Sequence, residues 1–144
     1  MLSLDTIRDA PKVLLHDHLD GGLRPSTIVD LAREHGYRGL PTGDPAELAG
    51  WIRRGADRKS LELYLETFAH TVGVMQHRDA IERVAHECAV DLAADGVVYA
   101  EVRMAPELCT EQGLTLDEVM QAMVDGFASG SRGDRKSTRL NSSH

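Results

Sequence analysis

Two histidines separated by one residue, His16 and His18, are the side chains of this sequence best placed to bind a metal ion. They follow a short apolar run at residues 13–15, which favours a β-strand. Side chains at positions i and i+2 of a strand point to the same face, so the two imidazoles would lie side by side at its end. Neutral imidazole is a preferred ligand of zinc. The spacing therefore indicates part of a zinc site, with an ordinary polar strand end as the alternative.

The residues around this pair would shape the same site. Asp20 follows two positions after the second histidine, and Gly21 and Gly22 would let the chain turn sharply and let a ligand approach the backbone. Asp17 would point to the opposite face of the strand, which makes it a poorer ligand for the same ion. One short segment thus combines metal ligands with a hydrogen-bond acceptor.

Strands alternate with helices in the chain that must position this segment. We expect strands at residues 12–18 and 97–104, and helices near residues 25–36, 45–53, 60–75, 78–94 and from 116 onward. Thr115 and Glu118 fit a capping box at the start of the last helix, and Ser60 is a plausible N-cap of the third. Strands separated by helices pair in parallel, so an α/β fold is expected.

Apolar side chains at helical spacing mark one face of the predicted helix 60–75. They are Leu61, Tyr64, Leu65, Phe68 and Val72. Such a stripe is either an ordinary core face or one wall of a substrate pocket. In the strand 97–104, Glu101 and Arg103 would face away from the covering helices, together with Tyr99. Both charged residues either brace the rim of an active site or lie on a half-exposed strand.

Composition excludes several other functions. The 144 residues carry a formal net charge of -7 and no basic patch interleaved with aromatic residues, so nucleic-acid binding is not expected. The apolar runs are far shorter than the roughly 20 residues that cross a bilayer, and the N-terminus does not resemble a signal peptide. Cys88 and Cys109 form no C-x-x-C pair. We expect a reduced, cytoplasmic protein that binds no membrane.

The character of the sequence changes near residue 129. Residues 130–144 are polar and basic, and they cannot bury enough apolar surface to offset the entropy of ordering. We therefore expect the native domain to cover residues 1–129. The segment 130–144 is interpreted as a disordered tail that continues through unrelated, non-native sequence, with a native disordered tail as the alternative.

Three segments of the chain, in matching order, resemble the adenosine deaminases of the amidohydrolase superfamily. They are the phrase P-K-V-L-L-H-D-H-L-D-G at residues 11–21, L-E-L-Y-L-E-T-F at 61–68, and V-Y-A-E-V-R-M-A-P at 98–106. The resemblance extends over nearly all of residues 8–129. It implies the N-terminal part of a (β/α)8 barrel of the TIM type, truncated after about two strands, because a whole barrel needs about 250 residues.

The family reaction is the zinc-dependent hydrolytic deamination of adenosine or deoxyadenosine to inosine or deoxyinosine, with release of ammonia. The resemblance implies that His16 and His18 bind the one Zn2+ of each full-length subunit, and that His18 also lies near the bound nucleoside. Asp20 would hydrogen-bond the ribose hydroxyl, at a position where adenine deaminases tend to have Glu. The apolar wall and lid of the pocket would be Leu61, Tyr64, Leu65 and Phe68. The expected partner is a small-molecule purine nucleoside, and the oligomeric state stays open.

No catalytic residue of the family is expected within this chain. The third zinc histidine, the glutamate that protonates the purine, the histidine that assists the attacking water and the later aspartates would all lie beyond residue 129. We therefore predict that the chain alone has no deaminase activity. The other helical histidines, His35, His70, His77 and His86, match no family position and are interpreted as surface or structural. An adenine or modified-nucleoside deaminase and a non-catalytic nucleoside-binding module remain the alternatives.

Overall fold

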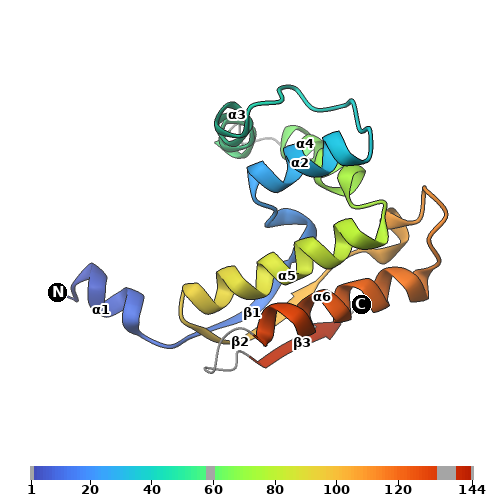
Figure 1. Cartoon of the computed structure of the whole chain (residues 1–144). Coiled ribbons are helices and arrows are strands. Elements are labelled where there is room, and N and C mark those ends of the chain that lie inside the picture. Colours follow the sequence, from blue (N-terminus) through green and yellow to red (C-terminus); the bar gives the residue numbers. More distant parts are fainter. Residues whose placement is uncertain (1, 58–60, 133–138, 144) are drawn as a thin grey trace.

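A computed structural model describes residues 2–57, 61–132 and 139–143 of the chain (Figure 1). Its elements in chain order are α1 (Leu4–Asp9), β1 (Lys12–His18), the 3-10 helix η1 (Leu19–Gly21), α2 (Pro25–Glu34), α3 (Pro45–Asp57), α4 (Leu61–Val74), α5 (Arg78–Ala94), β2 (Val97–Arg103), η2 (Pro106–Cys109), α6 (Leu116–Ser131) and β3 (Arg139–Ser143). The predicted order of strand, helices, strand and helix is present, and the α/β fold class is confirmed. The capping box of Thr115 and Glu118 is also present. Ser60, the predicted N-cap of α4, lies outside the described residues.

The described strands form one parallel sheet with β2 at its centre. β1 pairs along one edge of β2, from Lys12 opposite Val97 to His18 opposite Arg103, and β3 pairs along the other edge. Because the strands run parallel, their carboxyl ends lie together at one edge of the sheet. His18 therefore lies beside Arg103 at the edge where the functional groups of α/β proteins gather.

The pairing of β1 with β2 is irregular at the first histidine. Leu14 pairs with Ala100 and Asp17 with Val102, so β1 uses one residue more than β2 over this interval. A bulge of this kind bends a strand and changes the direction of its side chains. His16 thus stands on a distorted stretch of backbone and not on a regular ladder.

Helices α5 and α6 cover one face of the sheet (Figure 1). Ala100 and Val102 of β2 are fully buried in the resulting core, together with Ile81 of α5 and Met123 of α6. The two helices approach closely because α6 has glycine at the contact: a Cβ at Gly130 would lie 2.5 Å from the carbonyl oxygen of His86, and one at Gly126 would meet the backbone of Glu82. The α5–α6 pair is therefore a tightly packed support for β2.

Helices α2, α3 and α4 gather beyond the carboxyl end of β1 (Figure 1). Ile28 and Leu31 of α2 and Leu48 of α3 are almost completely buried between them. Leu19 of η1 is buried at the junction with β1, so the segment that follows the histidines is fixed to this helical group. The arrangement holds α4 over the end of the strand that carries the histidines.

The first strand is more exposed than its apolar sequence indicates. Val13 and Leu15 are 57% and 60% exposed. β1 is an edge strand, and among the described residues no element covers the sheet face opposite α5 and α6. The apolar run at residues 13–15 therefore forms a strand without burying all its side chains, because burial depends on neighbours that a local pattern does not reveal.

The C-terminal segment also differs from its prediction in the part that the structure describes. Helix α6 continues to Ser131, and Gly130 is packed against α5, so the helix passes the predicted boundary at 129. Arg139–Ser143 pairs in parallel with β2, where the sequence predicted disorder. Pairing with a free strand edge uses backbone N–H and C=O groups and does not depend on apolar side chains. The non-native origin of residues 130–144 stays a prediction.

One unpredicted element, α1, lies before the first strand. The Ser3 hydroxyl accepts a hydrogen bond from the backbone N–H of Thr6 at 3.1 Å and caps the helix. None of its residues is buried, and its two apolar residues, Leu4 and Ile7, are exposed. None of the helices in the described part of the chain is long and apolar enough to span a membrane.

Candidate active site

The two histidines at the end of β1 lie within reach of one ion. Their Nε2 atoms are 3.1 Å apart and their ring centroids 5.2 Å apart. Zinc–nitrogen bonds of about 2.0–2.1 Å in tetrahedral geometry place two ligand nitrogens about 3.4 Å apart. The observed separation is close to that value, so His16 and His18 fit two positions of a zinc site. Without an ion, the same separation lets one ring donate a hydrogen bond to the other.

Asp20 lies just beyond this pair, in η1, and its carboxyl group is short of partners. The residue is 7% exposed, and its Oδ1 atom has no hydrogen-bond partner among the described residues. Burial raises the pKa of Asp20, while its own backbone hydrogen bond and the neighbouring His18 lower it by less. His18 Nδ1 is 3.8 Å from Asp20 Oδ1. A buried acceptor without a partner costs about 1–3 kcal/mol, which a hydroxyl donor from a ligand would recover.

Helix α4 presents apolar side chains to the same space. Leu61, Tyr64 and Leu65 are exposed although they are apolar or aromatic. Phe68 packs edge to face against Tyr64, with ring centroids 5.3 Å apart at 74°. Exposed apolar side chains that surround a concave space are typical of a ligand pocket. All the residues of the stripe predicted on this helix line the pocket, and none of them belongs to the hydrophobic core.

One cavity of about 690 Å³ joins the histidine pair, Asp20 and the α4 wall. Every residue predicted to bind metal or nucleoside lines it: His16, His18, Asp20, Leu61, Tyr64, Leu65 and Phe68. Val72, the last residue of the predicted apolar stripe, also lines it, as do Met104, Ala105 and Leu108, for which no pocket role was predicted. Leu108 belongs to η2, which follows β2 and carries no local signal of a binding role.

Among the described residues, Arg103 is the arginine of the cavity wall, at the carboxyl end of β2. Its buried Nε atom has no hydrogen-bond partner among the described residues. Glu101 instead accepts a hydrogen bond from the Tyr99 hydroxyl at 2.9 Å. The two charged residues singled out in this strand thus have different surroundings, and Arg103 is the one at the pocket.

The two glycines after Asp20 have a smaller role than their type indicates. Neither Gly21 nor Gly22 has a positive φ. A Cβ at Gly21 would lie 3.5 Å from the Phe68 ring, which is an ordinary contact. The expected sharp turn is made by η1 with a backbone that other residues can also adopt.

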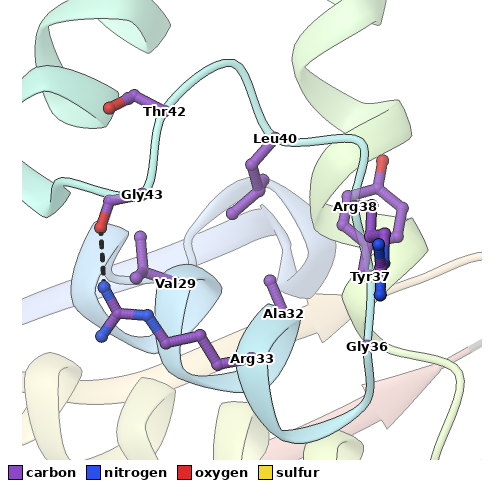
Figure 2. A pocket seen from close by; sticks show the side chains of 9 residues that line it. All are labelled: Val29, Ala32, Arg33, Gly36, Tyr37, Arg38, Leu40, Thr42 and Gly43. Atoms are coloured by element: carbon purple, nitrogen blue, oxygen red, sulfur yellow. Dashed lines mark hydrogen bonds between the residues drawn. The ribbon is translucent and has the colours of Figure 1, made fainter.

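A separate crevice of about 380 Å³ lies under the loop that follows α2 (Figure 2). Its floor is formed by Val29 and Ala32, and the Arg33 guanidinium donates a hydrogen bond to the Gly43 carbonyl at 3.0 Å across one end. It shares no lining residue with the cavity of the histidine pair. The described residues that line it include neither an imidazole nor a carboxylate.

The remaining titratable groups near the α2–α4 layer have structural surroundings. The Tyr37 hydroxyl lies 2.9 Å from His70 Nδ1, and Trp51 packs against the His70 ring edge to face. Burial lowers the pKa of His70 and raises that of Tyr37.

Cys88 and Cys109 are free thiols whose pKa is raised to about 12 by burial, so neither is a nucleophile at neutral pH.

Comparisons with known sequences agree on one family. The family model described as adenosine deaminase matches residues 11–138. The adenosine deaminase of Mycobacteroides abscessus is 66% identical over 131 residues, which cover 91% of this chain and 36% of that protein. The chain thus spans little more than a third of the length of this curated relative.

Solved structures with the same fold are also deaminases or amidohydrolases. The N6-mAMP deaminase of Arabidopsis superposes with a TM-score of 0.78 at 28% identity, over 96% of this chain and 42% of the other. An amidohydrolase from Burkholderia ambifaria, solved with bound Zn, gives a TM-score of 0.77 at 26% identity, over 97% of this chain and 38% of the other. The described strands and helices therefore correspond to one part of larger enzymes.

Proposed function

Because this chain belongs to the adenosine deaminase family, we propose that the protein of which it forms part hydrolyses adenosine or deoxyadenosine to inosine or deoxyinosine and ammonia. The family consists of hydrolases, and the chain is a segment of one. The site in this segment supports the binding half of the reaction. The substrate and the chemistry of the whole protein are the proposal.

The surroundings of Asp20 are the main observation that supports a nucleoside as the substrate. Its Oδ1 is buried in the wall of the large cavity and has no hydrogen-bond partner among the described residues. A carboxylate is a strong acceptor for a hydroxyl group, and a sugar hydroxyl supplies the missing donor. A free base such as adenine brings no hydroxyl, so an adenine deaminase would leave this acceptor unpaired.

The same carboxylate argues against a nucleotide substrate. The neighbour from Arabidopsis acts, by its name, on a nucleoside monophosphate. In this chain a 5′-phosphate near Asp20 would meet a second negative charge in a buried setting, where like charges repel strongly. We therefore propose an uncharged nucleoside as the substrate, with modified nucleosides as the alternative within the same class.

Zinc is the cofactor that the histidine pair fits. His16 and His18 would hold it through their Nε2 atoms, and the bound Zn of the Burkholderia amidohydrolase supports this assignment. When bound, zinc lowers the pKa of a water molecule to about 7 and so supplies a nucleophile. Two imidazoles are fewer than the three protein ligands of a catalytic zinc site, so further ligands must come from outside the described residues.

The residues of this chain bind and orient the nucleoside. Tyr64 and Phe68 offer an edge-to-face aromatic pair on which a purine can stack, and Leu65 extends the apolar wall that excludes water. Asp20 fixes the sugar, and His18 lies between the sugar acceptor and the metal position. We therefore assign nucleoside binding to this segment and proton transfer to the rest of the protein.

A chimera tests the proposal. Residues 11–130 of this chain replace the matching segment of the Mycobacteroides abscessus adenosine deaminase, and the fall in absorbance on conversion of adenosine to inosine is followed with zinc present. We expect turnover with adenosine and little with adenine or AMP. The matched control, His16→Ala in the chimera, should lose zinc and activity together.

The 144-residue chain alone provides the second arm of this test. We propose that it does not deaminate adenosine, because it offers half of a zinc site. Turnover by the chain alone that a chelator abolishes would contradict this statement, whereas an inactive but folded and zinc-loaded chimera would contradict the proposed function.

The two free thiols fit a reducing compartment, so a cytoplasmic location is part of the proposal.

A further inference from the structure

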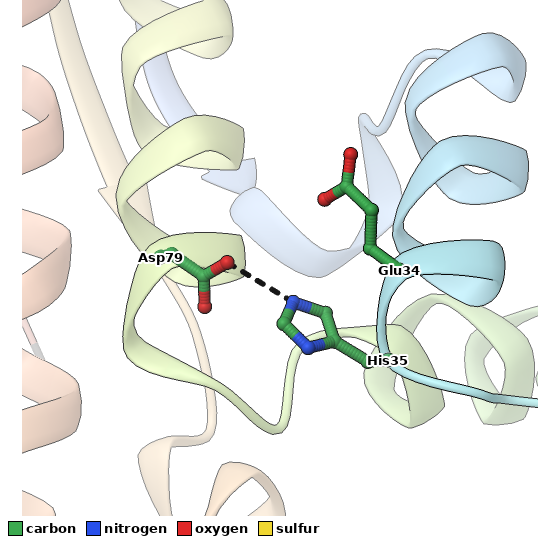
Figure 3. A group of neighbouring side chains, drawn as sticks. All are labelled: Glu34, His35 and Asp79. Atoms are coloured by element: carbon green, nitrogen blue, oxygen red, sulfur yellow. Dashed lines mark ion pairs between the residues drawn. The ribbon is translucent and has the colours of Figure 1, made fainter.

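A second group of metal-ligating side chains lies where α2 meets α5 (Figure 3). Glu34 is the last residue of α2 and His35 is its C-cap, while Asp79 stands in the first turn of α5. The ligand atoms of these three residues all lie within 4.8 Å of one another. None of them lines the cavity of the first histidine pair. The group therefore brings together an imidazole and two carboxylates at a separate place.

The contact between His35 and Asp79 is not an ordinary hydrogen bond. His35 Nε2 is 3.1 Å from Asp79 Oδ2, yet this buried nitrogen has no partner with hydrogen-bond geometry among the described residues. Two ligands of one first-row ion, bound at about 2.0–2.2 Å, lie about 3.0–3.5 Å apart. The separation fits the ion pair between the two side chains, and it also fits two ligands of one cation.

The imidazole of His35 is held in place from behind. His77, the N-cap of α5, stacks on it with ring centroids 4.0 Å apart and an interplanar angle of 15°. The His35 side chain is 19% exposed, whereas those of Glu34 and Asp79 are 55% and 67% exposed. A fixed imidazole beside two accessible carboxylates leaves an open side where an ion can enter and water can complete its coordination.

A neighbouring arginine does not occupy the group. Arg83 Nη1 lies 3.9 Å from Glu34 Oε1, at the limit of an ion pair. The same guanidinium donates at 2.9 Å to Asp30 and at 3.0 Å to Glu87. Those two acceptors neutralise Arg83 and leave the Glu34 carboxylate able to turn toward His35.

We propose that Glu34, His35 and Asp79 form a second divalent-cation site, separate from the His16–His18 pair. An imidazole with two carboxylates suits a first-row transition ion such as Zn2+ better than Ca2+ or Mg2+, which prefer oxygen ligands alone. The bound ion would join the C-terminal end of α2 to the first turn of α5. The site is thus structural in character and independent of deamination.

Zinc titration of the 144-residue chain tests the site. The His16→Ala and His18→Ala substitutions, made together, remove the first pair, and isothermal calorimetry then measures binding of Zn2+. We expect one remaining site whose affinity falls tenfold or more in Asp79→Asn and in His35→Gln. Asp117→Asn is the matched control, because Asp117 is likewise an acid in the first turn of a helix, α6, and should leave the affinity unchanged.

Nuclear magnetic resonance of the imidazole nitrogens provides a reading that does not depend on a variant. Addition of Zn2+ should shift the Nε2 resonance of His35 and leave that of His86, which contacts Ser129 through Nδ1, in place. Absence of a zinc site in the double-alanine background would overturn the proposal. So would an unchanged affinity in Asp79→Asn with an unshifted His35 resonance.

Discussion

Replacement of Asp20 by Asn in the chimeric enzyme isolates the interaction on which substrate choice depends. Asn keeps one oxygen acceptor but loses the charge, and charge-assisted hydrogen bonds are about twice as strong as neutral ones. A hydrogen bond to a charged group contributes about 1.5–3 kcal/mol, so the substitution should remove about half of it, about 0.8–1.5 kcal/mol. Since about 1.4 kcal/mol is a factor of ten, kcat/KM for adenosine should fall about 4- to 12-fold.

A change in the stability of the unliganded site should add to this loss of kcat/KM. Asp20 is buried with one unpaired oxygen, and the neutral amide is easier to bury than the carboxylate. The assay is the fall in absorbance on deamination, measured for adenosine and for its 2′-, 3′- and 5′-deoxy analogues. For the analogue that lacks the hydroxyl bound by Asp20, Asp20→Asn should cost almost nothing, because the interaction is already absent.

The comparison also defines the result that refutes the reasoning. If Asp20→Asn lowers kcat/KM by the same factor for adenosine and for all three deoxy analogues, the carboxylate does not bind a sugar hydroxyl. A uniform loss would instead assign Asp20 to the orientation of His18, whose Nδ1 atom lies 3.8 Å away. An unchanged kcat/KM for every substrate would remove Asp20 from the site.

Further outcomes follow from the packing and the titrating groups. Gly126→Ala should lower the free energy of unfolding, measured by urea denaturation, by about 1–3 kcal/mol, because the added Cβ would meet the α5 backbone. Gly50→Ala in α3 is the control and should raise it by up to about 1 kcal/mol, because the added Cβ would meet only a movable arginine side chain. Equal effects of the two substitutions would contradict the close contact between α5 and α6. Neither Cys88 nor Cys109 should react with a disulfide reagent at pH 8 before denaturation, because burial raises both thiol pKa values to about 12. Burial raises the pKa of Asp20, so the folded chain holds the proton of this carboxyl group to a higher pH than the unfolded chain does. The contribution of Asp20 to the free energy of unfolding therefore falls as the pH rises from about the ordinary pKa of 3.8 through the raised pKa. Asp20→Asn should flatten that part of the pH profile of stability, and an unaltered slope would contradict the raised pKa.

Local spacing was enough to predict the parts of the site that depend on one element. The i, i+2 relation predicted that His16 and His18 lie together, and their Nε2 atoms are 3.1 Å apart. The helical stripe predicted that Leu61, Tyr64 and Phe68 share a face. Both predictions rest on backbone periodicity. The bulge in β1 interrupts that periodicity, and Asp17, which was predicted to point to the opposite face, lines the same cavity as His16 and His18.

The errors arise where a residue's role depends on distant neighbours or on an element's last residue. Met104 follows the end of β2 at Arg103, and it belongs to the buried core and also lines the cavity. Leu108 reaches the same cavity through η2, and Val13 is exposed because β1 lies at the sheet edge. No pattern within a strand encodes which edge or face the fold leaves open.

The bulge in β1 gives the two halves of the cavity different stiffness. Between the pairs Leu14–Ala100 and Asp17–Val102 the backbone of β1 has an extra residue, so His16 is less constrained than a residue of the regular ladder. Asp20 has no such freedom, because η1 is buried beside Leu19 against the helical layer. The pocket is therefore less constrained at His16, the proposed metal ligand, than at Asp20, the proposed sugar acceptor.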